Sequence, residues 1–175
     1  NLRQVGSQTT EQNQLPTGLQ LGLGVRTVAT SRNFMQGGLQ QSNSNLDVAI
    51  KGNGFFQVTM PDGTAAYTRD GSFQVDSQGR LVTSSGLPVA NGITIPPNAT
   101  SISIGTDGTV SALLQGNTAP QPLGSIAMAN FINAPGLEPR GENLYVETAA
   151  SGQPTQGTPG TNGLGTVVQG YLETS

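Results

Sequence analysis

Aspartate followed closely by glycine is the recurring pair in this sequence that could bind a metal ion. It occurs four times, at Asp62-Gly63, Asp70-Gly71, Asp76 to Gly79 and Asp107-Gly108. An EF-hand calcium loop needs oxygen ligands at alternate positions and a closing glutamate, and none of the four segments has that spacing. Aspartate before glycine also builds hairpin turns, because the carboxylate caps the turn and glycine tolerates positive φ. The pattern therefore predicts turns rather than metal sites.

The acidic residues Glu138, Glu142 and Glu147 form the other group with chemical potential, since paired carboxylates hydrolyse glycosides. Arg140 lies between the first two, and residues 139–143 around it are typical of a solvated turn. We interpret these charges as structural and expect no catalytic residue.

Three further segments could be taken for functional features, but none of them indicates a functional site. Gly52-Asn53-Gly54 lacks the third glycine, the helix and the Lys-Ser/Thr pair of nucleotide-binding loops, so it predicts a tight turn with positive φ. Phe55-Phe56 follows in a strand, which places the rings on opposite faces and indicates packing. Asn98-Ala99-Thr100 fits the glycosylation sequon, a tripeptide that is frequent by chance.

The composition excludes several classes of function. The 175 residues include no His and no Cys, which removes imidazole bases, thiolate nucleophiles, disulfides and the commonest zinc and iron ligands. Trp is also absent, and seven basic against ten acidic residues give a net charge of −3, so no cationic surface for nucleic acid is expected. No apolar run approaches the roughly 20 residues of a membrane span and no signal peptide is visible. We therefore expect no cofactor, no nucleic acid and no small-molecule substrate.

Residues 47–148 have the pattern of an all-β, antiparallel domain. Short apolar or alternating segments are separated by Gly, Asp, Asn and Pro turns about every ten residues, and no segment reads as a long amphipathic helix. The expected strands are residues 47–51, 55–59, 66–69, 72–75, 80–83, 87–89, 93–95, 101–104 and 109–113, with further strands within 124–133 and 143–148.

Two polar arms bracket this domain, as in an inserted domain whose chain leaves and returns to a common stem. Residues 1–46 predict an extended arm with a short hairpin strand, in which Leu19, Leu21, Leu23 and Val25 form one apolar face. Residues 149–175 predict a Gly/Pro-rich return arm that ends in a strand. We expect residues 1–14 and 149–163 to be disordered or held only by neighbours, because their composition supports no core.

The segment Asp47 to Val58 resembles the bacterial flagellar rod and hook family, as do residues 67–76, 79–83, 104–111 and 141–145. Within the family, Leu15 to Arg26 is similar to an insertion that marks the distal rod subunits, and residues 169–175 fit the approach to a C-terminal helix. The terminal helices of the family are absent and the chain begins at Asn1, so we expect a fragment of a longer protein.

The resemblance implies a structural subunit of the distal rod and no enzyme activity. The implied partners are further copies of the same chain in a helical homopolymer, the proximal rod and hook proteins, and the surrounding ring proteins. The implied location is the flagellar basal body, in the rod that crosses the periplasm and transmits motor torque, after export by the flagellar type III system. From the exposed apolar strand, we expect Leu19, Leu21, Leu23 and Val25 to contact a neighbouring subunit.

Three alternatives remain open at this point. A secreted carbohydrate-binding or adhesion module would also be an all-β domain, although zero Trp and three Tyr offer few aromatic platforms for sugars. The chain could also be the related proximal rod or hook protein, or, more remotely, a carboxylate glycosidase. A glycan-binding titration separates the adhesion module from the rod subunit.

Overall fold

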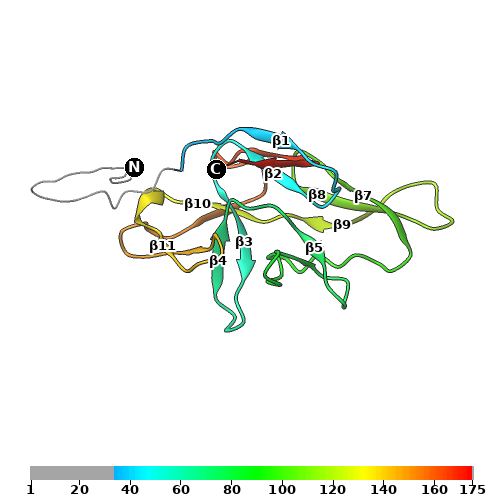
Figure 1. Ribbon diagram of the computed structural model, residues 1–175, viewed down its shortest axis with the longest axis horizontal. Helices are drawn as coiled ribbons and strands as arrows, with labels where there is room; N and C mark the ends of the chain where they lie inside the picture. Colours follow the sequence, from blue (N-terminus) through cyan, green and yellow to red (C-terminus); the bar gives the residue numbers. More distant parts are fainter. Residues whose placement is uncertain (1–33, 175) are drawn as a thin grey trace, which may run out of the picture. The chain divides into compact units, whose positions relative to one another are not determined.

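The computed structural model describes residues 34–174 and shows a fold made almost entirely of strands (Figure 1). The chain divides into two units, residues 1–34 and 35–175, and the fold described here is that of the second. Its elements are β1 (Leu39–Gln41), β2 (Val48–Lys51), β3 (Phe55–Thr59), β4 (Ala65–Thr68), β5 (Gln74–Val75), β6 (Leu81–Val82), β7 (Ala99–Ile104), β8 (Thr109–Leu114), β9 (Gln121–Ser125), β10 (Met128–Asn130), the 3₁₀ turn η2 (Ala134–Gly136), β11 (Glu138–Pro139), β12 (Tyr145–Val146), β13 (Thr155–Gly157), β14 (Thr166–Gln169) and β15 (Tyr171–Glu173).

All paired strands are antiparallel, which confirms the predicted fold class. The largest sheet has six strands in the order β11-β12-β4-β3-β10-β13, and a second sheet has the order β7-β8-β9. The predicted turns at residues 60–64, 76–79 and 105–108 join β3 to β4, β5 to β6, and β7 to β8, and each of these pairs is a hairpin. Within residues 34–174, no helix is long and apolar enough to cross a membrane.

The two ends of the described segment return to each other. β1 pairs with β15, with Leu39 opposite Glu173, and β2 pairs with β14, with Val48 opposite Gln169. Figure 1 shows the consequence, because the blue β1 and the dark red β15 lie together although they come from opposite ends of the sequence. The paired strands β1 and β15 are called the ribbon below.

Two buried layers hold the strands together. The main cluster packs one face of β3 against β2, β7, β8 and β14. It contains Ile50, Phe56, Phe73 and Met128. Phe55 points to the other face of β3, where its ring packs against Phe131 at 6.0 Å between centroids. The prediction that the neighbouring rings of Phe55 and Phe56 serve packing on opposite faces agrees with this, and both side chains are buried.

The return segment is more ordered than its composition predicts. β13 pairs with β10, Leu164 is buried in the main cluster, and Pro159 is buried over Gly108. Ser151 is fully buried, and the hydrogen bonds that its hydroxyl and amide exchange with Thr148 satisfy its polar groups. The expectation of disorder at residues 149–163 is therefore wrong. This segment is ordered because it pairs with β10 and packs into the core formed by the rest of the domain. The corresponding expectation for residues 1–14 lies outside the described residues.

Candidate functional site

Three of the four aspartate–glycine segments are turns, as predicted. Gly63, Gly79 and Gly108 have φ between 81° and 88°. Asp62 accepts hydrogen bonds from the Thr64 hydroxyl at 2.6 Å and its amide at 3.0 Å, and these lower the pKa of the Asp62 carboxyl. Each carboxylate thus stabilises its own turn.

The other two turn carboxylates are held in the same way. The pKa of Asp107 is lowered mainly by the hydrogen bond from the Thr109 amide, at 3.0 Å. At Asp76 desolvation acts to raise the pKa, but hydrogen bonds from the backbone and side chain of Arg80 and the backbone of Gln78 outweigh it and lower the pKa.

The fourth segment, Asp70-Gly71, is a different structure. The strands on either side, β4 and β5, belong to different sheets, and Gly71 does not have positive φ. A Cβ atom at Gly71 would overlap the carbonyl oxygen of Val48, whose amide donates a hydrogen bond to the Gly71 carbonyl at 3.0 Å. The hairpin predicted here is wrong, because glycine is needed for close approach to β2 and not for a left-handed turn.

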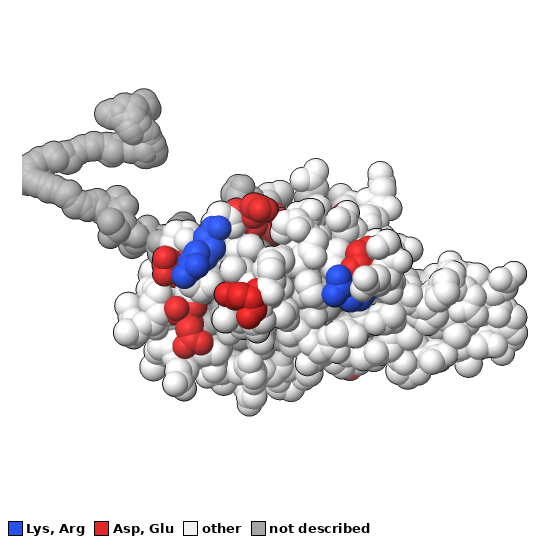
Figure 2. Space-filling view, turned by 90° about the horizontal axis from the view of Figure 1, so that it is seen from below, with Lys and Arg blue, Asp and Glu red and all other residues white. Residues whose placement is uncertain are grey.

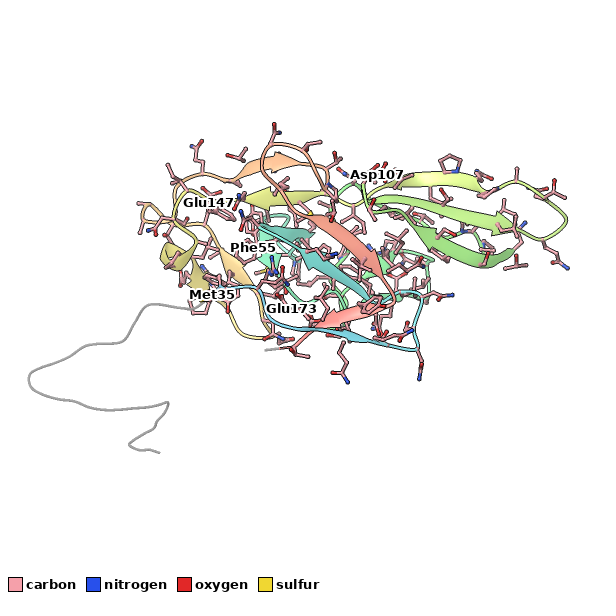
Figure 3. All side chains as sticks on the ribbon, turned by 90° about the horizontal axis from the view of Figure 1, so that it is seen from above. Met35, Phe55, Asp107, Glu147 and Glu173 are labelled. Carbon is pink, nitrogen blue, oxygen red and sulfur yellow. The ribbon has the colours of Figure 1, made fainter. Side chains whose placement is uncertain are left out.

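The acidic residues do not form a chemical site. Glu138 pairs with Arg140 at 3.5 Å in the hairpin between β11 and β12, and Glu142 lies in its turn with a φ of 55°. Over residues 34–174 there is no group of three or more acidic side chains placed to hold a metal ion. Figure 2 shows charged side chains of both signs scattered in small groups over the face it presents, and Figure 3 places Asp107 and Glu147 well apart.

An open groove lies beside the β5–β6 hairpin, with a volume of about 690 Å³. Its lining is mainly apolar and includes Val75, Ile95, Pro97 and Ile102, and its acidic residue, Asp76, is paired with Arg80 at 2.8 Å. The groove therefore presents no free pair of reactive groups.

The best-built polar site in the described segment is one that the sequence did not indicate. Arg69, which follows β4, donates two hydrogen bonds to the carboxylate of Glu173 on β15, from Nε to Oε1 at 3.0 Å and from Nη2 to Oε2 at 2.7 Å. Its Nη1 donates to the carbonyl oxygens of Gly52 and Gly54 at 2.8 and 2.9 Å. The two charged side chains are only 16% and 12% exposed. The guanidinium thus makes four hydrogen bonds with its five N–H groups, in a planar arrangement that a lysine could not reproduce.

The incoming chain joins the same carboxylate. Gln36 donates to Glu173 Oε2 at 2.7 Å, and the amide of Gly37 donates to the same oxygen at 2.9 Å. The side-chain oxygen of Gln36 in turn accepts from the amide of Gly52 at 2.7 Å. Figure 3 shows Glu173 on β15 with Met35 near the start of the chain that leads into β1. We call Arg69, Glu173, Gln36, Gly37 and Gly52 the clamp.

The four predicted subunit-contact residues, Leu19, Leu21, Leu23 and Val25, lie outside the described residues. The structure therefore adds nothing to that prediction.

Comparison with known proteins shows that the chain is similar to flagellar components. A family model described as the flagellar hook protein FlgE/F/G D1 domain matches residues 49–112. The flagellar basal-body rod protein FlgG of Buchnera aphidicola subsp. Schizaphis graminum is 54% identical over 99% of this chain and 67% of its own length. The protein of the same name from Caulobacter vibrioides is 45% identical over 99% of this chain and 67% of its own length.

A flagellar rod protein with a different name is also similar but more distant. The basal-body rod protein FlgF of Caulobacter vibrioides is 36% identical over 71% of this chain and 49% of its own length. The similarity to the FlgG proteins therefore extends beyond the shared domain into both flanking segments, and this chain spans about two thirds of their length.

Proposed function

This chain belongs to the FlgG family of flagellar basal-body rod proteins, and from that membership we propose that it is a structural subunit of the distal rod in the flagellar basal body. The observation that carries the proposal is the 54% identity over 99% of the chain to a relative named as a rod protein. The flanking segments share in that identity, whereas a general hook or rod domain accounts for residues 49–112 only.

The fold supports a structural role. β1 and β15 run together, so the chain enters and leaves the β-domain at one place. In a subunit of this kind the β-domain is carried on a stem formed by the parts of the protein that precede and follow it. The proposed partners are other copies of the chain in a helical homopolymer, the proximal rod and hook proteins and the rings around the rod, after export by the flagellar type III system. The proposed activity is mechanical, the transmission of torque, and not catalytic.

The contact between copies is proposed to include Leu19, Leu21, Leu23 and Val25. In an extended segment, their alternation would place the four apolar side chains on one face. Covering such a face with a neighbouring subunit contributes several kcal/mol, at roughly 25 cal/mol per Å² of apolar surface.

The function is tested in cells that lack this gene and are complemented with the full-length protein. Loss of the gene is expected to leave basal bodies with an incomplete rod and without a hook in electron micrographs, and complementation should restore both. Complete rods in the deletion strain would contradict the proposal.

The contact residues are tested in the same strain. Changing all four to Asn should weaken rod assembly or stiffness, whereas Gln20→Asn, at a position that the alternation assigns to the other face, should not. Equal behaviour of the two variants would rule out a contact role for the apolar face while leaving the rod function intact.

A further inference from the structure

The ribbon contacts β2 through β15, and each of its two ends is held in a different way. At one end, the amide of Gly170 donates to the carbonyl of Asp47 at 2.7 Å and the amide of Ser42 donates to the carbonyl of Gly170 at 2.8 Å. Gly170 has a φ of 83°, so the chain turns sharply where β14 ends and β15 begins. This end is attached to β2 and β14 through the covalent chain.

The other end of the ribbon has no such covalent attachment to the β-domain. There the incoming residues 36–37 and the outgoing Glu173 are held through Arg69 and Gly52, which lie 104 and 16 residues away from their partners. A two-stranded ribbon is only marginally stable by itself, so its direction depends on what it is tied to.

We propose that the clamp is the joint that fixes the direction in which the ribbon leaves the β-domain, and that Arg69 is the positioning residue at its centre. With the clamp closed, the ribbon is tied at both ends and cannot rotate. With the Arg69–Glu173 pair broken, this end of the ribbon keeps, of the clamp's contacts with the β-domain, only the hydrogen bond from the Gly52 amide to Gln36, and we expect the ribbon to swing about the end at Gly170. This joint is a property of the folded chain itself, so measuring it needs no assembled rod.

An ordinary surface ion pair would not have this effect, because exposed pairs contribute little and are screened by solvent. The Arg69–Glu173 pair differs in being bidentate, mostly buried and shared with two backbone carbonyls and an amide. Removing one member of such a pair leaves the other charge and several backbone groups without their partners.

The same domain offers a matched control. Arg80 binds Asp76 through Nε at 2.8 Å, but the two residues are four positions apart in one hairpin and Arg80 is 46% exposed. Arg80→Gln therefore removes an arginine–carboxylate contact of similar length that does not join distant segments. Glu173→Gln is a second variant that breaks the clamp from the other side with little change in size.

Because the chain contains no cysteine, two spin labels can be placed without background. One is attached at Met35→Cys, a position that is 80% exposed beside the clamp, and the other at the exposed Ser84→Cys on the β-domain. The distances between the labels are measured by pulsed electron resonance on the 175-residue chain. A narrow distribution is expected in the labelled chain with the clamp intact and in its Arg80→Gln variant, and a broad one is expected in Arg69→Gln and Glu173→Gln.

Amide hydrogen exchange provides the second readout. Breaking the clamp should accelerate exchange at Gly37, whose amide donates to the Glu173 carboxylate, about 10- to 100-fold, the range expected when a charge-assisted hydrogen bond is lost. The amide of Val48, in the core, should change by less than about 3-fold, since global unfolding is not involved.

Two results would overturn the proposal. One is an unchanged, narrow distance distribution in both clamp variants. The other is exchange that rises equally at Gly37 and at Val48, because that would make Arg69 a general contributor to stability and not a joint. If Arg69→Gln fails to fold, Glu173→Gln alone decides between these results.

Discussion

Gly71 and Gly63 follow aspartates in identical dipeptides, yet the structure predicts very different costs for replacing them with alanine. At Gly63 a Cβ atom would meet nothing within 4 Å, and the difficulty is only the positive φ of 88°. At Gly71 the Cβ atom would overlap the Val48 carbonyl and approach the ring of Phe56 to 3.0 Å. Gly63→Ala strains a turn, whereas Gly71→Ala forces β2 away from the segment that contains residue 71.

The magnitudes can be worked out from these contacts. An alanine in the left-handed region costs about 1–2 kcal/mol, which is the whole effect expected for Gly63→Ala. Gly71→Ala adds overpacking, which costs about 1–3 kcal/mol, and weakens the buried hydrogen bond from the Val48 amide to the Gly71 carbonyl, which costs about 1–3 kcal/mol more. We expect Gly71→Ala to lower the free energy of unfolding by about 2–6 kcal/mol in total.

Urea unfolding followed by circular dichroism measures this difference, since the chain has no Trp for fluorescence. Both variants keep the preceding aspartate, so a loss of turn capping cannot explain a difference between them. Equal midpoints for Gly63→Ala and Gly71→Ala would refute the reasoning, because it would mean that the segment around Gly71 relaxes away from Val48 at no cost.

Two further predictions test the second buried layer and the turn carboxylates. Phe131→Ala should cost about 3–5 kcal/mol, because its ring packs against two other buried aromatic rings, whereas Ile132→Ala, at a neighbouring position that is 95% exposed, should change the free energy of unfolding by less than about 0.5 kcal/mol. Similar urea midpoints for the two variants would contradict that assignment. The folded-state pKa values of Asp62, Asp76 and Asp107 lie below the ordinary 3.8, so their stabilisation is complete above about pH 4 and is lost as the pH falls through those lower values. Replacing all three with Asn should flatten the loss of stability between about pH 4 and pH 2 in urea titrations, and an unchanged slope would show that other carboxylates dominate.

The local structure of residues 47–148 was largely readable from the sequence. Alternating apolar residues and turn-forming residues act over a few positions, so segments such as Phe55–Thr59 and the turn at residues 105–108 follow from the residues alone. Asp70-Gly71 shows the limit of that reasoning. Its dipeptide has the same local preference as Asp62-Gly63, but the backbone of Val48, 23 positions earlier, determines what it becomes.

Partners far apart in the sequence were not readable in the same way. Alternation says which side chains share a face, but it does not say that Met128 lies opposite Gly157 or that Val48 lies opposite Gln169. The order of residues 149–163 depends on such pairings, because their own composition buries too little apolar surface. A prediction based on composition within one window therefore underestimated the structure of that segment.

The clamp was missed because the segments that contain its two charges, residues 67–76 and 169–175, resemble the family without indicating that Arg69 and Glu173 meet. Charged side chains are also scarce in this domain, so each ion pair can be considered individually. Three ion pairs occur within residues 34–174, and two of them, Arg80–Asp76 and Arg140–Glu138, join residues that are close in sequence. The third joins β15 to the end of β4, across 104 positions, at the place where the chain enters and leaves the domain. Hydrophobic burial holds the layers together without specifying a single angle for a two-stranded ribbon at their edge, whereas a bidentate pair has one good geometry. An ion pair between distant segments therefore restricts the direction of the domain relative to its stem most effectively when it lies at that joint.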